Sequence, residues 1–275
     1  EHHFPQRIHL FTEDSESYLQ LPGLQRSGYE DPPRYRGSLE LAGDEAGLQV
    51  VNQLPLEQYL YAVVPGEMPV SFGLEALKAQ AVAARSYAYR NVFSARYRSR
   101  GAHVDDSVMT QVYNHIPEEP LSTEAVDETA GMALFHEGQP IEALFFSTSW
   151  GYTAAAHQVW ADGSGGELPG TPIPYLAAIS QFPGEAPPVE TDQDVLRLLI
   201  EDEWEAYDDQ SPYYRWHLEM SAAALAASIN HNLSQRYAAD PDYVLTRVGE
   251  DFVSRDIPED PLGQLLNIQV SRRGD

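Results

Sequence analysis

The feature that most constrains the fold is a long helical pattern between Gly73 and about Tyr97. Apolar residues recur there at steps of three and four, which is the spacing of one helix face. The positions on this face are Leu74, Leu77, Ala81, Ala84 and Ala88. Because most of these side chains are small, neighbouring elements can approach the helix closely. The pattern therefore predicts a long helix at the centre of the fold.

Shorter patterns surround this helix. They predict hairpins over 34–41 with 48–54 and over 132–135 with 141–146, helices over 122–129, 193–207 and 221–237, and a last strand over 267–273. This order predicts an α+β fold, in which antiparallel sheet and hairpins pack against the long central helix and several shorter helices. Residues 1–33 are polar and rich in turn-forming residues. We therefore expect an irregular N-terminal segment over 1–33 and a single domain over 34–275.

Composition excludes several classes of function. The chain has 275 residues, of which 17 are basic and 42 acidic, and a formal net charge of −25. Long-range repulsion at this charge opposes binding to nucleic acid and to anionic membranes. No stretch approaches the roughly 18 consecutive apolar residues that a membrane-spanning helix needs. Since the chain has no cysteine, disulfides, thiol nucleophiles and thiolate metal sites are also excluded.

Glu67 is the residue whose surroundings favour chemistry. It is expected in a rigid turn between Pro65 and Pro69, just before the long helix. Its apolar neighbours Met68 and Phe72 could desolvate the carboxyl group and raise its pKa, as a general acid requires. The nearby helix N-terminus would act in the opposite direction. The sequence leaves open which effect is larger, and a capping or solvated carboxylate is the alternative interpretation.

This stretch resembles the signature of the stage II sporulation protein D/LytB family. The family's hallmark is a Glu-Met-Pro turn followed by a helix close to Glu-Ala-Leu-Lys-Ala-Gln-Ala-Val-Ala-Ala-Arg-Thr/Ser-Tyr, and both parts are present, at Glu67–Pro69 and Glu75–Tyr87. Further resembling segments follow the family order: Tyr35-Arg36-Gly37, 56–60, Gln111-Val112-Tyr113, Ala125-Val126 with Thr129-x-Gly131, 145–153, Val159-Trp160 and Pro174-Tyr175-Leu176. The resemblance covers the chain from about residue 34 onward.

The resemblance implies a lytic transglycosylase that acts on the glycan strands of peptidoglycan. Such an enzyme cleaves the bond between N-acetylmuramic acid and N-acetylglucosamine. One carboxyl group protonates the glycosidic oxygen and then accepts the proton of the muramoyl 6-hydroxyl, which attacks C1 and leaves a 1,6-anhydro sugar. No second carboxylate has to activate water, unlike ordinary glycoside hydrolysis. By this resemblance Glu67 is the catalytic acid and base, and no cofactor is expected.

Other residues of the resembling segments are candidates for substrate contacts. Arg85 could pair with a muramoyl carboxylate or orient Glu67, and a structural role in the interior is the equal alternative. The remaining candidates are Tyr113, Ser147, Ser149 and Thr153 for hydrogen bonds to sugar, and Trp150 as a stacking platform. Ser147 and Ser149 have the alternative of satisfying only loop backbone groups.

The chain departs from the family pattern in three places. Trp150 stands where the first glycine of the Ser-x-Ser-Gly-Gly-x-Thr loop is usual, so either the backbone conformation or the access to the cleft is expected to differ there. The cysteines with which some members bind zinc are absent, so no metal site is predicted. The family continues into a Ser-Gly-Arg element near residue 275, and we therefore expect a truncated C-terminus. No leader is visible, and the implied substrate predicts an extracytoplasmic protein whose leader is absent from this chain.

Two functions remain open at this point. The first is the enzyme, and the full Glu67 motif favours it. The second is a non-catalytic enhancer that assists a separate cell-wall amidase, because some family members carry that role. Trp150 and the unusual charge leave room for this alternative.

The charge generates a first prediction, that the fold is weaker in dilute buffer than in salt. Unscreened like charges destabilise a compact state, and the screening length falls from about 30 Å at 0.01 M to about 3 Å at 1 M salt. We expect the melting temperature to rise between low and molar NaCl. A melting temperature that stays constant or falls would contradict this. Sulfate is unsuitable for the test because it stabilises most proteins whatever their charge.

Overall fold

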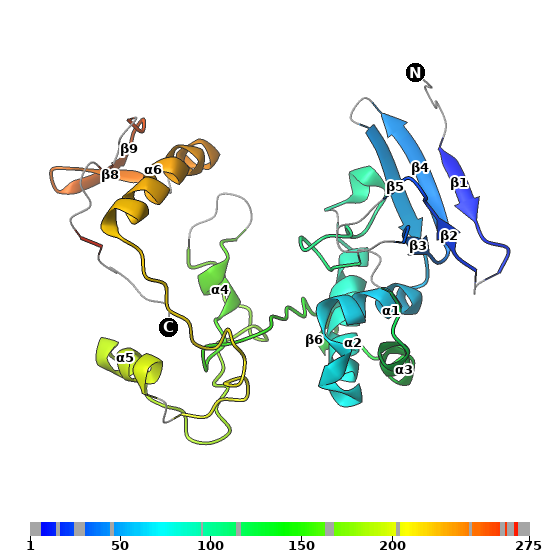
Figure 1. Cartoon of the computed structure of the whole chain (residues 1–275), viewed down its shortest axis with the longest axis horizontal. Helices are drawn as coiled ribbons and strands as arrows, with labels where there is room; N and C mark the ends of the chain where they lie inside the picture. Colours follow the sequence, from blue (N-terminus) through cyan, green and yellow to red (C-terminus); the bar gives the residue numbers. More distant parts are fainter. Residues whose placement is uncertain are drawn as a thin grey trace. The chain divides into compact units, whose positions relative to one another are not determined.

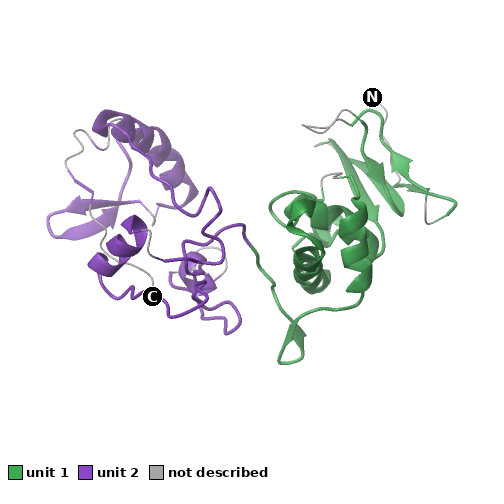
Figure 2. Cartoon of the chain, turned by 60° about the horizontal axis from the view of Figure 1, so that its bottom comes forward, with its two compact units in different colours: residues 1–145 green, residues 146–275 purple. Residues whose placement is uncertain are grey.

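The computed structural model describes residues 7–14, 17–24, 31–44, 47–94, 96–113, 117–162, 168–201, 204–241, 244–258, 262 and 267–268. Helices and small antiparallel sheets are both present, so the predicted α+β class is confirmed (Figure 1). The chain divides into two compact units, residues 1–145 and 146–275 (Figure 2), which are described separately below. The extent of the expected domain, 34–275, stays a prediction.

A three-stranded antiparallel sheet begins the first unit. Strands β4 (Ser38–Asp44) and β5 (Gly47–Gln53) form the first predicted hairpin, and β1 (Ile8–Phe11) pairs with the other edge of β4. Part of the segment expected to be irregular is therefore a strand. Its backbone satisfies the open edge of β4, and Leu10, opposite Leu39, packs against the core. A second small sheet pairs β2 (Leu19–Gln20) with β3 (Arg34–Tyr35).

Three helices complete the core of this unit: α1 (Leu56–Glu67), α2 (Leu74–Val92) and α3 (Pro120–Glu128). The predicted long helix is α2, and Leu77, Ala81 and Ala84 on its small-residue face are fully buried. Helix α1 was not predicted, because Pro65 and Gly66 near its end are poor helix formers. Both α1 and α3 pack against α2, so the long helix is central, as expected.

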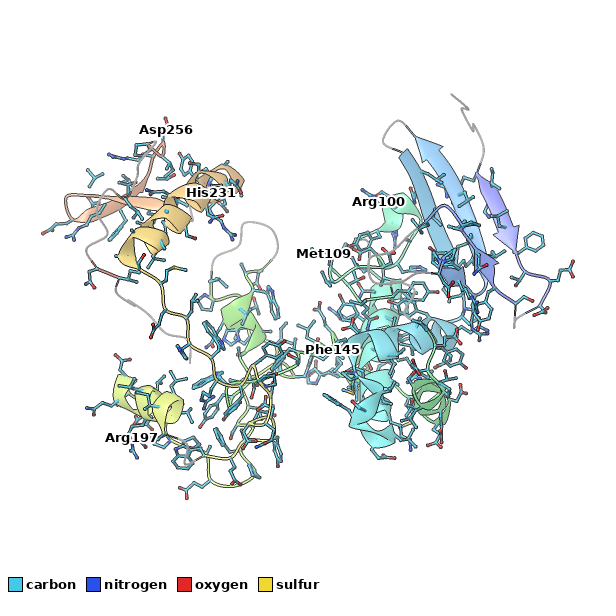
Figure 3. The ribbon with its side chains drawn as sticks, in the orientation of Figure 1. Arg100, Met109, Phe145, Arg197, His231 and Asp256 are labelled. Atoms are coloured by element: carbon cyan, nitrogen blue, oxygen red, sulfur yellow. The ribbon has the colours of Figure 1, made fainter. Side chains whose placement is uncertain are left out.

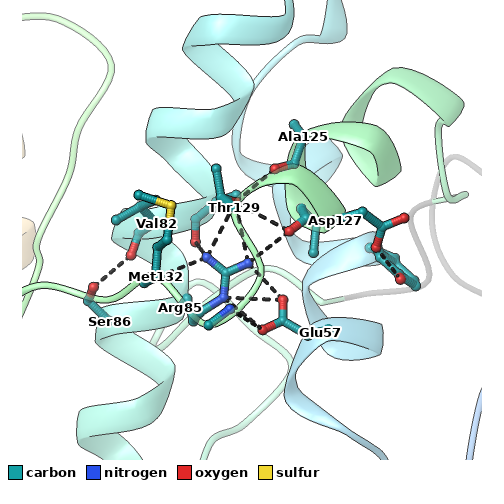
Figure 4. A network of polar contacts seen from close by, with 12 residues as sticks. Glu57, Val82, Arg85, Ser86, Ala125, Asp127, Thr129 and Met132 are labelled. Carbon is teal, nitrogen blue, oxygen red and sulfur yellow. Dashed lines mark hydrogen bonds and ion pairs between the residues drawn. The ribbon is translucent and has the colours of Figure 1, made fainter.

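A buried ion pair holds the three helices together (Figure 4). Arg85 of α2 is only 2% exposed and donates three hydrogen bonds to Glu57 of α1, from Nε to Oε1 at 3.0 Å and to Oε2 at 3.2 Å, and from Nη2 to Oε2 at 2.7 Å. Arg85 also donates to the carbonyl oxygens of Val126 on α3 and of Met132, both at 3.1 Å. Glu57 in turn accepts the backbone N–H of Gly131 at 3.2 Å. One guanidinium group thus fixes the packing of α1, α2 and α3.

The second predicted hairpin is present with short strands, β6 (Phe135–His136) and β7 (Gln139–Pro140). Glu137 and Gly138 have φ angles of 49° and 76°, and two positive values make this a hairpin turn that matches the twist of the strands. The strands are shorter than the predicted 132–135 and 141–146, and beyond them one further bond continues the pairing, from the N–H of Ile141 to the carbonyl oxygen of Leu134 at 3.2 Å.

The second unit contains helices α4 (Ala156–Val159), α5 (Asp192–Ile200) and α6 (Ala222–Ala239) and a hairpin of β8 (Leu245–Val248) and β9 (Asp251–Ser254). The helix predicted over 221–237 is confirmed, with Ser221 as its N-cap. The helix predicted over 193–207 ends at Ile200, because Trp204 packs against Phe182 and the N–H of Tyr207 bonds to a loop carbonyl. Of the strand predicted over 267–273, the described residues 267 and 268 are not in a strand, and the rest lies outside the described residues.

Within the described part of the chain, no helix is long and apolar enough to cross a membrane.

The buried ion pair generates a second prediction. Glu57→Ala leaves the Arg85 charge inside the core without its carboxylate, and we expect the free energy of unfolding to fall by about 3 kcal/mol, since breaking a buried pair costs roughly 3–5 kcal/mol and Glu57 is partly exposed. The matched control is Glu75→Ala, because Glu75 also forms a 2.7 Å ion pair, with Lys78, but on the surface. There we expect a much smaller loss, because solvent-exposed ion pairs contribute little to stability. Equal losses in urea unfolding of the two variants would contradict the role of Arg85.

Candidate active site

Glu67 is the last residue of α1. Pro65 lies inside the final turn, and Met68, the C-cap, leaves the helix with an extended backbone at φ −138°. The expectation of a stretch between two prolines outside any helix is therefore corrected: Pro65 belongs to the helix, and Pro69 follows its end, where a helix cannot continue. This places Glu67 at the C-terminal end of one helix rather than only near the N-terminus of the next.

The carboxyl group of Glu67 is partly buried and has one well-defined partner. Its Oε1 accepts the backbone N–H of Val112 at 2.8 Å. Burial raises the pKa of Glu67, the Val112 hydrogen bond acts in the opposite direction, and burial is the larger effect. The partial negative charge at the end of α1 also favours the protonated form. The question that the sequence left open is thus answered in favour of a raised pKa.

Val112 is held at Glu67 by its two neighbours. Gln111 is buried and donates to the carbonyl oxygen of Ala84 on α2 at 3.2 Å, while its own oxygen accepts the hydroxyl of Tyr59 at 3.2 Å. Tyr113 stacks on Tyr59 with ring centroids 5.1 Å apart. Alternate side chains of this extended segment thus point into the core, and the N–H between them points at Glu67. The Gln-x-Tyr motif was recognised in the sequence, but the role of the intervening N–H was not.

Tyr113 itself is an interior residue. Its hydroxyl donates to the side-chain oxygen of Asn52 on β5 at 2.8 Å, and burial raises its pKa well above the usual range. The same applies to Tyr59, whose pKa burial also raises. The contacts of Tyr113 explain how Val112 is positioned. A contact between Tyr113 and sugar stays a prediction.

The contacts of Arg85 fit the structural alternative. Its nitrogen atoms bond to Glu57, Val126 and Met132 as described above, and further to Thr129 and Ala81 at 3.4 Å. With 2% exposure the guanidinium faces the interior. The Ala-Val-x-x-Thr-x-Gly element therefore has a structural reason: Val126 and Thr129 accept from Arg85, and Gly131 donates to Glu57.

The Ser147–Thr153 loop belongs to the second unit. Ser149 is buried and binds Asp208 through both its backbone N–H and its hydroxyl, and its Oγ accepts the N–H of Gly151 at 3.0 Å. These contacts fit the alternative in which Ser149 satisfies polar groups of its own loop. Gly151 has φ +109°, and a Cβ there would lie 2.5 Å from Phe182, so this position requires glycine.

The other candidates of this loop differ in exposure. Ser147 and Trp150 are exposed, and Trp150 has no positive φ, so its replacement of the usual first glycine causes no backbone strain. Its ring lies 5.4 Å from that of Tyr152. Thr153 joins two loop segments, since its Oγ1 accepts the N–H of Ile179 at 2.8 Å and donates to Ala177. Binding of sugar by Ser147, Ser149, Trp150 and Thr153 stays a prediction.

The described residues also show which side chains could bind a metal ion. Among them, no group of three histidine or acidic side chains could hold an ion. The shift of the Glu67 pKa likewise has no contribution from a charged side chain. Among the described residues, the groups that the structure brings together here are the Glu67 carboxyl group and the Val112 N–H.

The raised pKa of Glu67 generates a third prediction. A carboxyl group whose pKa is higher in the folded than in the unfolded state stabilises the fold below its unfolded pKa, and that contribution is lost as pH rises through the folded pKa. Glu67→Gln removes this titration and keeps an acceptor for Val112. We therefore expect wild type to lose stability relative to Glu67→Gln as pH rises from 4 to 7. Urea unfolding across this range tests it, and a difference that moves the other way would contradict burial as the dominant effect.

Comparisons with known proteins agree with the family resemblance seen in the sequence. The family model described as Stage II sporulation protein matches residues 44–136. Stage II sporulation protein D of Bacillus subtilis is 41% identical over 145 residues, covering 48% of this chain and 40% of that protein, and its Bacillus amyloliquefaciens counterpart is 42% identical over 143 residues, covering 47% and 39%. The amidase enhancer of Bacillus subtilis is 37% identical over 119 residues, covering 43% of this chain and 14% of that protein.

The chain thus spans about 40% of the length of the curated sporulation proteins that it matches. Glu57, Glu67, Arg85 and the Gln111–Tyr113 segment all lie inside the matched region. Through residues 44–136, the chain is similar to the stage II sporulation protein D family, as the sequence motifs predicted.

Proposed function

We propose that this protein is a peptidoglycan lytic transglycosylase in which Glu67 is the general acid and base. The observation that carries the proposal is the environment of Glu67, a partly buried carboxyl group with a raised pKa and a backbone donor at 2.8 Å. The family relation supports a function at the cell wall. The substrate, the glycan strands of peptidoglycan, is part of the proposal.

Both halves of the reaction suit this environment. Burial favours the protonated carboxyl group, which can donate its proton to the glycosidic oxygen. The carboxylate that results is stabilised by the Val112 N–H, which bonds more strongly to an ionised oxygen than to a neutral one. It can then accept the proton of the muramoyl 6-hydroxyl as this group attacks C1. Because the 6-hydroxyl and not a water molecule attacks C1, no second carboxylate is needed to activate water, and one carboxyl group is sufficient.

The second candidate is a non-catalytic enhancer of a cell-wall amidase. The identity of 37% with a protein named amidase enhancer favours it. In this case Glu67 would bind glycan without transferring a proton. Both candidates place the protein outside the cytoplasm and require neither nucleic acid nor a cofactor.

The fourth prediction separates the two candidates. Glu67→Gln is nearly isosteric but cannot donate a carboxyl proton, and we expect the release of anhydro-muramoyl products to fall by about 10⁴-fold, the upper end for general acid–base catalysis, because one residue serves both steps. Glycan binding should persist. Glu75→Gln is the matched control, since Glu75 lies in the same motif with its side chain 85% exposed. Its activity should equal that of wild type.

The measurement combines a glycan pull-down with mass spectrometry of the released products. Near wild-type release by Glu67→Gln would refute the catalytic assignment. If wild type releases no anhydro products from intact or peptide-stripped glycan but stimulates an amidase, the enhancer function replaces the enzyme.

A further inference from the structure

The loop over 105–113, which carries the Val112 donor, is anchored at a point away from Glu67. Asp105 accepts hydrogen bonds from the backbone N–H of Ser107 at 2.9 Å and from its hydroxyl at 2.8 Å. Thr110 donates to the backbone oxygen of Asp105 at 2.7 Å and approaches its carboxylate at 3.3 Å. Asp105 therefore closes residues 105–110 into a compact turn that ends directly before Gln111.

The same carboxylate ties this turn to the segment that follows α2. Its second oxygen accepts the hydroxyl of Tyr97. A parallel contact joins Arg96 to the backbone oxygen of Met109 at 3.3 Å. Met109 and Arg100, both labelled in Figure 3, lie on the chain that continues from α2. The turn is thus fixed to the C-terminal end of the long helix, whereas Gln111 is fixed to the helix itself through Ala84.

We propose that Asp105 is a positioning residue for Glu67, because it orders the turn from which the Val112 N–H reaches the carboxyl group. Asp105 acts through the loop backbone and has no contact with the reacting atoms. Burial by itself would raise the pKa of Asp105, but the hydrogen bonds from Tyr97, Ser107 and Thr110 outweigh it and leave the pKa lowered. The carboxylate is consequently ionised, and keeps its role as an acceptor, over the pH range in which Glu67 titrates. The proposal deepens the proposed function, but its test does not require glycan cleavage.

The direction of the effect distinguishes positioning from direct electrostatics. If Asp105→Asn loosens the turn, Glu67 loses its N–H donor and its pKa rises. If the Asp105 charge acted on Glu67 directly, its removal would lower the Glu67 pKa instead. Tyr59 of α1 interacts with the Glu67 charge, and it is unchanged in this variant.

The experiment follows the carboxyl carbon of Glu67 by NMR in the full chain labelled with ¹³C-glutamate, with the signal assigned by its absence from Glu67→Gln. We expect Asp105→Asn to raise the Glu67 pKa by about one unit, as loss of a hydrogen bond to an ionised group implies. Amide exchange at Val112 should become faster. Asp127→Asn is the matched control, because Asp127 accepts a tyrosine hydroxyl in the same way, from Tyr61 at 2.6 Å, but lies on α3.

A Glu67 pKa that stays constant or falls in Asp105→Asn overturns the proposal, and so does an equal rise in Asp127→Asn. If Asp105→Asn does not fold, the test uses Tyr97→Phe, which removes the hydrogen bond from Tyr97 to Asp105 and leaves the Asp105 charge in place. A smaller rise of the Glu67 pKa in this variant supports the proposal, and no rise overturns it. A wild type that releases no anhydro products refutes the enzyme but leaves this titration unaffected. The two failures can therefore be told apart.

Discussion

The packing of the first unit depends on the burial of one positive charge. Arg85 lies on the face of α2 that meets α1 and α3, and it is 2% exposed, so its acceptors have to come from the protein. Glu57 supplies the opposite charge, and the last turn of α3 and the residues after it supply carbonyl and hydroxyl oxygens. A buried pair of this kind adds little net stability, but removing one partner is costly. It therefore specifies which helices pack together and in which register.

The candidate site is built on this arrangement. Glu57 at the start of α1 is fixed to Arg85. Because Glu67 lies at the other end of the same helix, this contact also positions Glu67. The Gln111–Tyr113 segment is fixed independently, to α2, α1 and β5. The 2.8 Å contact between Val112 and Glu67 is where these two supports meet. The two partners of this hydrogen bond are well fixed in position, because each is held by buried contacts rather than by solvent-exposed ones.

The motifs of the sequence turn out to have different physical purposes. Glu67 is a carboxyl group whose pKa burial raises. Arg85, Thr129 and Gly131 take part in the contacts that join the helices, and Gln111 and Tyr113 hold the segment that carries the Val112 N–H. The sequence offered Arg85 and Tyr113 as candidates for substrate contacts, with a structural role as the equal alternative for Arg85. Their contacts with sugar stay predictions, and the structure adds that both side chains are buried, which a motif alone does not reveal. Ser149, tied to Asp208, illustrates the same point in the second unit.

The sequence alone determined what depends on local pattern and on specific residue strings. The small-residue periodicity of α2, the cap at Ser221, the first hairpin and the Glu67 motif could all be found there, since each is encoded by neighbouring residues. Only the tertiary structure decided that Pro65 lies inside α1, that β1 joins the sheet, and that the helix after Asp192 ends at Ile200. It also decided that burial exceeds the opposing effects on Glu67. These outcomes depend on contacts between residues far apart in the chain, such as Glu67 with Val112, whose free energies no local pattern contains.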